Sequence, residues 1–322
     1  MHVFHGYDHV PLALRGAALA IGNFDGVHRG HQALLARARE RAIASTRHGA
    51  SHLAGAIVFE PHPREFFHPD RPHFRLTTLA RKLELFERYG LDMAVVLSFD
   101  QKLAALSAED FIEKVLVAGL GVRHVVIGYD FYFGRARCGN AEHMRRAAAE
   151  MGFGVSIVAP VAEGGEVFSS SAIRAEIAQG DVTGAAEMLG HWWAIRGTVV
   201  GGAKRGTGMG YPTANILLPR TTTLAHGIYA VFVQVAGKRH QGAAYLGTRP
   251  TFDGGPPVLE IFLFDFDDDL YGREIEVSFV EFIRGDGRFE GMEALMMQMD
   301  DDCAKAKVIL AAAPTHVGQS GT

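Results

Sequence analysis

The periodicity of the apolar residues changes near residue 186, and this change constrains the fold more than any other feature of the chain. Before it, short apolar runs alternate with segments of helical periodicity. Strands that alternate with helices are typical of a parallel sheet covered on both faces. We therefore expect an α/β domain over residues 1–185, with strands at 17–21, 55–59, 94–97, 125–127 and 155–158 and helices at 31–47, 79–89, 109–118 and 141–151.

After this point the helical periodicity stops and short alternating strands follow. They are expected at residues 194–200, 228–235, 241–245, 258–264 and 275–282, with glycine-containing turns. This pattern favours an antiparallel β-barrel. One face of a final helix is expected to carry Leu295, Met299, Cys303, Ala306 and Leu310. The second domain is predicted to span residues 186–313, and residues 314–322 to form a flexible tail.

Composition argues against several classes of protein. The formal net charge of −4 over 322 residues does not fit a dedicated nucleic-acid binder. Cys138 and Cys303 have no C-x-x-C partner, so neither a disulfide framework nor a cysteine zinc site is expected. We find no signal-peptide pattern and no run approaching the ~20 apolar residues of a membrane helix. We expect a cytoplasmic protein with neither nucleic acid nor membrane as a partner.

Residues 22–31 form the first candidate site. They follow the first expected strand, turn at glycines and lead into a helical pattern. A helix start offers unpaired N–H groups and the positive end of the helix dipole, which favours a phosphate. Gly26 and Gly30 would let a ligand approach the backbone, and His28 and His31 could donate hydrogen bonds to it. A chance H-x-x-H pair among 16 histidines is the alternative, and the strand–turn–helix context argues against it.

Two further unusual loops are expected at the same edge of the sheet, where the carboxyl ends of parallel strands bind ligands. The second strand leads into F-E-P-H-P-R at residues 59–64, and the fourth into G-Y-D-F-Y-F-G at residues 128–134. The aromatic loop could contact a large, flat, mostly apolar ring. Alternatively, the prolines only shape a turn and the aromatic residues belong to the core.

Hydroxyl groups and an arginine precede another helical pattern, in S-S-S-A-I-R at residues 169–174. A serine N-cap explains part of this motif. The same groups at a helix start could also bind the phosphates of a nucleotide.

The second half has a glycine-rich basic loop at residues 201–210, followed by Y-P-T-A-N at 211–215. The loop lacks the G-x-x-x-x-G-K-S/T phosphate-loop pattern. Later, Glu260 interrupts an apolar strand, and Phe262 and Phe264 share its face, which argues against a fully solvated face. The acidic runs 265–269 and 300–302 lack EF-hand spacing, so we expect a solvated hairpin tip and a solvated helix face.

In this order, the motifs resemble those of the bacterial bifunctional riboflavin kinase/FMN adenylyltransferase family, also called FAD synthetase. Residues 22–31 are similar to its H-x-G-H nucleotidyltransferase signature, and the next two loops to F-x-P-H-P and G-x-D-F-x-F-G. The S-S-T-x-I-R motif has Ser171 in place of threonine. Residues 201–215 and Glu260 resemble the riboflavin kinase domain. The resemblance implies a Rossmann-like nucleotidyltransferase domain followed by an antiparallel β-barrel kinase domain with a C-terminal helix.

The implied chemistry has two steps. ATP phosphorylates riboflavin to FMN, and a second ATP adenylylates FMN to FAD with release of pyrophosphate; Mg²⁺ is the implied divalent cation. Riboflavin, FMN and ATP are the implied partners, and weak self-association is left open.

The resemblance also implies the residues of each site. Catalytic roles fall to His28, His31 and Glu260. The first ATP site comprises Gly22, Asn23, Phe24, Asp25, Gly26, Ser170, Ser171 and Arg174. The flavin site of the first module comprises His62, Pro63, Asp130, Phe131 and Phe133. The nucleotide loop of the kinase comprises Gly202, Lys204, Arg205, Gly206, Gly208 and Gly210. The metal is implied to bind Thr213 and Asn215.

The kinase half departs from the family pattern. Thr207 replaces an arginine and Met209 a leucine, while Tyr245 replaces an asparagine and Phe262 a histidine. These departures keep an alternative open, in which the chain is an adenylyltransferase only and the barrel is a flavin-binding or regulatory module. A nucleotidyltransferase acting on another phosphate or acid substrate is a third hypothesis, and the aromatic loop argues against it.

Overall fold

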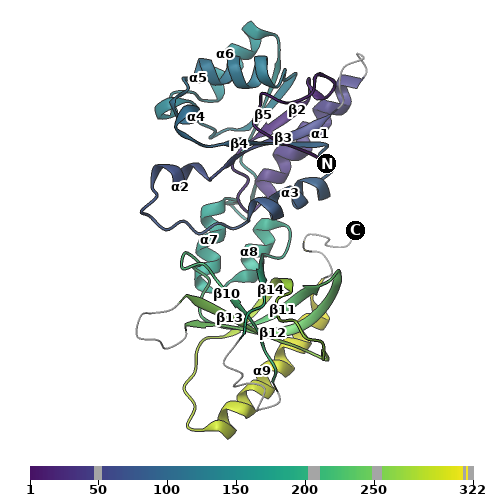
Figure 1. The fold of residues 1–322 in the computed structure, drawn as a ribbon, viewed down its shortest axis with the longest axis vertical. Coiled ribbons are helices and arrows are strands. Elements are labelled where there is room, and N and C mark those ends of the chain that lie inside the picture. The colour runs from purple at the N-terminus through teal and green to yellow at the C-terminus, as the bar shows by residue number, and fades with distance from the viewer. Residues whose placement is uncertain (47–52, 202–210, 249–255, 315–316, 318–322) are drawn as a thin grey trace. The chain divides into compact units, whose positions relative to one another are not determined.

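The chain folds into two compact units, Met1–Ser169 and Ser170–Thr322 (Figure 1). The computed structural model describes residues 1–46, 53–201, 211–248, 256–314 and 317. The helices α7 (Ser170–Gln179) and α8 (Val182–Leu189), close to the boundary expected at residues 185–186, group with the second unit. The reason is that α8 packs on the sheet of that unit, where Thr183 Oγ1 donates a hydrogen bond to the Val280 carbonyl at 3.0 Å.

The first unit is built on a parallel sheet which, in the described residues, has six strands in the order β1-β4-β3-β2-β5-β6. The strands are β1 (His2–His5), β2 (Ala18–Ile21), β3 (Ala54–Glu60), β4 (Met93–Ser98), β5 (His124–Gly128) and β6 (Gly154–Val158). The predicted parallel sheet is confirmed. Strand β1 was not predicted, because its mostly exposed residues give no apolar run.

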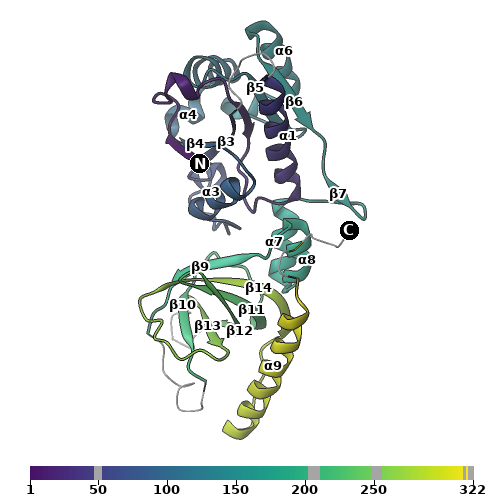
Figure 2. The ribbon, with the colours of Figure 1, turned by 90° about the vertical axis from the view of Figure 1, so that its right-hand side faces the viewer.

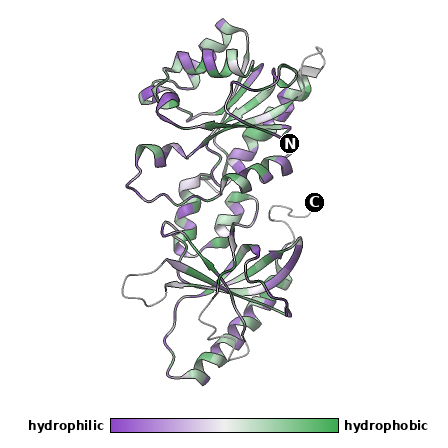
Figure 3. Cartoon of the chain, in the orientation of Figure 1, coloured by the Kyte–Doolittle hydropathy of each residue, from purple (hydrophilic) through white to green (hydrophobic). Residues whose placement is uncertain are grey.

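Alternate side chains of these strands enter two separate hydrophobic cores, one on each face of the sheet. Leu19 and Ile21 face the core that contains Ile112 and Met144, whereas Ala20 faces the core of the opposite layer. The covering segments are α1 (Arg29–Thr46), α3 (Leu79–Arg88), α5 (Ala108–Asp110) with the π-helical segment η2 (Phe111–Gly119), and α6 (Ala141–Met151). Figure 3 shows that hydrophobic residues dominate the strands. The sheet is therefore covered on both sides, as predicted.

Strand β2 lies at the point where the chain reverses its direction across the sheet. From β2 the chain continues to β3 and β4 on one side, then returns to β5 and β6 on the other. The loops after β2 and β5 therefore leave in opposite directions, and ligands bind at such switch points. The short helices α2 (Pro63–Phe67) and α4 (Gln101–Ala105) follow β3 and β4 at the same edge.

The second unit is a nearly closed antiparallel barrel. Its strands are β9 (Ala194–Thr198), β10 (Ala214–Leu217), β11 (Gly227–Val235), β12 (Lys238–Thr248), β13 (Pro257–Leu263) and β14 (Glu274–Arg284). Their order in the described residues is β10-β13-β12-β11-β14-β9. Just after β9, the Val200 N–H donates to the Asn215 carbonyl at 2.8 Å, which brings the two edges together. The predicted barrel is confirmed.

The final helix, α9 (Met292–Ala312), covers part of the outer barrel surface. Ala306 and Leu310 are buried against Phe232 and Phe264, so the predicted apolar face of the helix is confirmed there. Figure 2 shows the N-terminal part of α9 running beyond the barrel, and Met297 in that part is exposed. In the described part of the chain, no helix is both long and apolar enough to cross a membrane.

The acidic run 300–302 is the predicted solvated helix face only at Asp300 and Asp301, and the prediction is wrong for Asp302. Asp302 is only 3% exposed, and both of its carboxylate oxygens accept hydrogen bonds from Arg284, at 2.7–3.1 Å. Asp300 accepts a hydrogen bond from the Tyr211 hydroxyl. Asp302 therefore joins α9 to the barrel, whereas Asp300 and Asp301 are exposed, and Asp301 pairs with Lys305. Helical periodicity could not reveal partners that lie far away in sequence.

We predict that Asp302→Ala destabilises the second unit by about 3 kcal/mol, because it leaves the partly buried Arg284 without its partner. The adjacent Asp301→Ala removes an exposed i,i+4 pair with Lys305 and should leave the stability of the unit nearly unchanged. Both tryptophans, Trp192 and Trp193, lie in this unit, so tryptophan fluorescence during urea unfolding reports on it. Equal losses in the two variants would contradict the structural role of the Arg284–Asp302 pair.

Candidate active sites

A turn with an unusual backbone follows β2. Phe24 and Val27 have positive φ angles of 49° and 44°, and both are fully buried. Residues other than glycine rarely adopt this left-handed conformation, which costs roughly 1–3 kcal/mol each and persists only where packing enforces it. The Phe24 ring is held edge-on to Phe86 with centroids 5.2 Å apart. Gly26, at φ 89°, completes the turn.

Asp25 fixes this turn to a distant segment of the chain. Its Oδ1 accepts hydrogen bonds from the N–H groups of Leu76 and Thr77, both at 3.0 Å, and from the Thr77 hydroxyl at 3.3 Å. Thr77 Oγ1 in turn accepts the Gly26 N–H at 3.0 Å. Asp25 is 3% exposed, so it shapes the turn from inside.

The two histidines of the motif are brought together at the start of α1. Their rings stack with centroids 3.7 Å apart, and the His31 N–H donates to His28 Nδ1 at 3.3 Å. An accepting Nδ1 places the proton of neutral His28 on Nε2. Gly30 permits this packing, because a Cβ there would lie 3.0 Å from the His28 ring.

Both histidines are neutral at physiological pH. Burial lowers the pKa of His28 to about 4, although Asp25 raises it. Burial lowers the pKa of His31 well below its usual value, and the charges of His28 and Lys82 lower it further. Among the described residues, His31 Nδ1 is buried without a hydrogen-bond partner. The pair therefore offers neutral N–H donors at a helix start.

The loop after β3 is fixed by ion pairs. His62 caps α2, where its Nδ1 accepts the Arg64 N–H at 3.1 Å. Burial, followed by the effect of His73, lowers the pKa of His62 to about 4. Arg75 binds Glu60 at 2.7 Å and also Glu65. Neither Arg75 nor Thr77 was singled out from the sequence, because only the folded loop places them at the site.

The aromatic loop after β5 divides into a buried and an exposed part. Phe133 is 7% exposed, pairs through both backbone hydrogen bonds with Gly139 and stacks on Phe131 at 5.6 Å. The alternative that the aromatics are core residues therefore holds for Phe133. Tyr129 and Tyr132 are about half exposed, and the Arg137 guanidinium lies 4.7 Å above the Tyr132 ring. The alternative that the aromatic residues belong to the core is therefore wrong for these two tyrosines.

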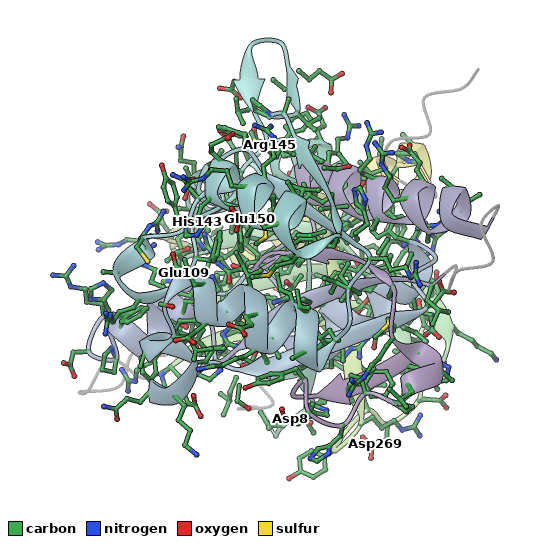
Figure 4. All side chains as sticks on the ribbon, turned by 90° about the horizontal axis from the view of Figure 1, so that it is seen from above. Asp8, Glu109, His143, Arg145, Glu150 and Asp269 are labelled. Atoms are coloured by element: carbon green, nitrogen blue, oxygen red, sulfur yellow. The ribbon has the colours of Figure 1, made fainter. Side chains whose placement is uncertain are left out.

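A histidine–glutamate contact lies beside the buried side of this loop. His143 on α6 lies 3.2 Å from Glu109 on α5, and both are labelled in Figure 4. The His143 ring also packs at 6.0 Å from Phe133. Asp130, in the exposed part, is solvated.

The serine-rich motif opens α7 in the second unit. Ser170 is the first residue of the helix and Ser171 is exposed. Arg174 Nη1 donates to the Ser170 carbonyl at 3.0 Å, so the guanidinium lies beside the first turn. The segment that precedes α7 belongs to the first unit and contains Glu163 and Phe168. It contacts the residue that follows the first motif histidine: Arg29 pairs with Glu163 at 2.6 Å, and its guanidinium lies 5.6 Å from the centroid of the Phe168 ring.

The barrel register brings the predicted kinase residues together. Glu260 on β13 lies directly between Asn215 on β10 and Tyr245 on β12. Its neighbours Leu259 and Ile261 are fully buried inside the barrel, so Glu260 occupies the outer face. It is half-buried there, as the apolar residues of its face suggested.

Asn215 is 3% exposed, and its Nδ2 donates to the Thr213 carbonyl at 3.2 Å. This bond directs Oδ1 away from that carbonyl. In the part of the chain that the structure describes, no cluster of three or more histidine, cysteine or acidic side chains could hold a metal.

The two departures from the family pattern on this face have structural partners. Phe262 packs edge-on against Tyr211 at 5.1 Å, and the hydrogen bond to Asp300 raises the pKa of Tyr211 to about 12. Burial raises the pKa of Tyr245, and Asp286 and then Glu260 raise it further.

The predicted nucleotide loop lies outside the described residues, as does Thr207. Its predicted residues are Gly202, Lys204, Arg205, Gly206, Gly208 and Gly210.

The fold and these sites define a two-module phosphotransfer protein, with a histidine turn on a parallel sheet and an Asn–Glu pair on a barrel. Family models describe the two modules as FAD synthetase over residues 11–172 and riboflavin kinase over residues 189–310. The chain belongs to the bifunctional riboflavin kinase/FMN adenylyltransferase family.

Individual relatives agree with this assignment. The chain is 39% identical to the bifunctional riboflavin kinase/FMN adenylyltransferase of Pseudomonas fluorescens, over 97% of this chain and 98% of the relative. It is also 39% identical to that of Escherichia coli K12, over 89% and 90%. A Streptococcus pneumoniae structure described as a macrolide-efflux protein shares the fold with a TM-score of 0.84 and 27% identity, over 98% of this chain and all of that one.

Proposed function

We propose that the two activities of the chain, riboflavin kinase and FMN adenylyltransferase, use two separate sites, with adenylyl transfer at the histidine turn and phosphorylation at the barrel. The observation that carries the first assignment is the pair of stacked, neutral histidines at the start of α1. Neutral N–H donors of the side chains and the positive end of a helix dipole together support an anion site that needs no metal-binding side chain.

Adenylyl transfer is an in-line displacement. An oxygen of the FMN phosphate forms a bond to the α-phosphorus of ATP, and the bond from that phosphorus to the β-phosphate bridging oxygen breaks. The attacking phosphate is already ionised at neutral pH, so no protein base is required. Catalysis then rests on positioning and on charge stabilisation, which His28 Nε2–H and His31 supply.

The remaining residues of the first site fall into two kinds. Gly22, Asn23 and Gly26 offer backbone to ATP, while the buried Phe24 and Asp25 hold that backbone in shape. Ser170, Ser171 and Arg174 are proposed to bind the pyrophosphate.

We assign the flavin of the first site to the loops after β3 and β5. His62, Pro63, Asp130 and Phe131 are proposed to contact it, with Phe133 as a buried support behind Phe131.

At the barrel, Glu260 is proposed as the general base that accepts the proton of the riboflavin 5′-hydroxyl as its oxygen attacks the γ-phosphorus of ATP. Its register neighbour Asn215, with Thr213 two residues before it, supplies oxygen donors, which fit Mg²⁺ as a hard cation. When bound, Mg²⁺ would neutralise phosphate charge.

We further propose the cytoplasm as the compartment of this protein, in agreement with two free cysteines.

The first test is His28→Ala, which removes one donor to the phosphates. FAD formation from supplied FMN should fall by ~10²–10³ in kcat, the usual effect of losing one such donor. FMN formation from riboflavin should not change, because it uses the other site. The exposed His5→Ala in the same sheet serves as a control with full activity. FAD formation within a few-fold of wild type would exclude the assignment.

The reciprocal test is Glu260→Gln, which keeps the size of the side chain and removes its basicity. FMN formation should fall by ~10²–10⁴, the usual contribution of a general base. FAD formation from supplied FMN should be unaffected. Glu281→Gln changes an exposed residue of β14, a strand of the same sheet that does not pair with β13, and should leave both products unchanged. If Glu260→Gln retained its FMN rate, the base would have to be another residue.

A further inference from the structure

Lys82 on α3 is a buried cation that none of the recognised motifs contains. It is 4% exposed, and its Nζ donates a hydrogen bond to the Asn23 carbonyl at 2.7 Å. Among the described residues, no second hydrogen-bond acceptor reaches Nζ. Burying an ammonium group with a single hydrogen bond is unfavourable, and burial indeed lowers the pKa of Lys82. A stability argument alone does not explain this lysine.

The hydrogen bond acts on the left-handed turn of the first site. Asn23 directly precedes Phe24, the first residue with a positive φ angle. The turn is thus held at two successive points, by Lys82 through the Asn23 carbonyl and by the Asp25 carboxylate through Leu76 and Thr77. Both contacts originate from α3 or from the segment that leads into it.

We propose that Lys82 is a positioning residue for adenylyl transfer: its buried ammonium holds the Asn23 carbonyl and thereby fixes the turn that presents His28 and His31 to ATP. This inference rests on the role proposed for the two histidines. Lys82 itself need not touch ATP.

A second consequence follows from the charge of Lys82. For His31, burial lowers the pKa most, followed by His28 and then by the positive charge of Lys82. For His62, burial lowers the pKa most, followed by His73; Asp25 raises it, and the charge of Lys82 lowers it by a smaller amount. The charged groups that face Lys82 are Asp25, Glu60, Arg75 and Glu65. Since burial and Lys82 both disfavour protonation, these histidines stay neutral at lower pH than they otherwise would.

The neutral state of the histidines matters because His28 Nδ1 must accept the hydrogen bond from the His31 backbone N–H. A positively charged, protonated histidine beside this bond disturbs the pair. Removing the Lys82 charge raises the pKa of His31 and His62. The fall in FAD formation on the acid side should then begin at higher pH than in the wild type. The titration of the FMN phosphate is common to all variants and cancels in the comparison.

The experiment compares Lys82→Met, Lys82→Gln and Lys82→Arg with the wild type, in the full chain. The two neutral variants should lower kcat for FAD formation from FMN by ~10²-fold, the order expected for a misplaced donor. Lys82→Arg keeps the charge and should recover most of the rate. Lys114→Met removes an exposed lysine that pairs with Asp110 and should be fully active. FMN formation in each variant is the internal control.

The pH profile of FAD formation separates positioning from a purely structural role. We expect the acid limb of any folded neutral variant to move to higher pH, and that of Lys82→Arg to match the wild type. If Lys82→Met does not fold, Lys82→Gln carries the measurement. Neutral variants within twofold of the wild-type rate, or a loss of rate that is equal at every pH, would overturn the proposal.

Failure of this proposal is distinguishable from failure of the proposed site. If His28→Ala loses FAD formation while the Lys82 variants remain normal, only the role of Lys82 is wrong. If His28→Ala is itself active, the histidine site is wrong and the Lys82 proposal falls with it.

Discussion

The buried carboxylate of Asp25 is the interaction on which the first site depends. It accepts hydrogen bonds from two backbone N–H groups and one hydroxyl of a segment about 50 residues away, and is itself almost inaccessible to solvent. These bonds hold two non-glycine residues in a left-handed backbone that a free peptide would avoid. Because the backbone is fixed in advance, the histidines that follow it would need little further ordering to bind a phosphate in the role proposed for them.

The two modules position their reactive groups by different physical means. In the first unit a strained turn, closed by distant hydrogen bonds, presents donors at a helix start. In the second unit the register of three strands brings Asn215, Glu260 and Tyr245 side by side on the outer face of the barrel. A turn can present backbone N–H groups to phosphates, whereas a strand register holds a carboxylate at a fixed distance from neighbouring amide groups.

The sequence was sufficient for both architectures, because periodicities of two and 3.6 residues record which faces are buried. It also singled out the motif histidines and Glu260, whose neighbours in sequence form their local context, and their roles stay predictions. It could not identify Thr77, Lys82 or Arg75, since each joins the site through a contact made only after folding. The same limitation explains Asp302, whose partner Arg284 lies on another element. Among the aromatic residues, the sequence pattern could not separate the buried Phe133 from the exposed Tyr132.

The central claim is that one chain carries two independent active sites that act in succession. The most direct measurement is a time course of the wild-type protein with riboflavin, ATP and Mg²⁺, with flavins separated by chromatography. FMN should form first and FAD should follow at the expense of FMN, with pyrophosphate released in step with FAD. If riboflavin remained unchanged and FAD formed only from supplied FMN, the barrel would not be a kinase and the account of the second site would be wrong.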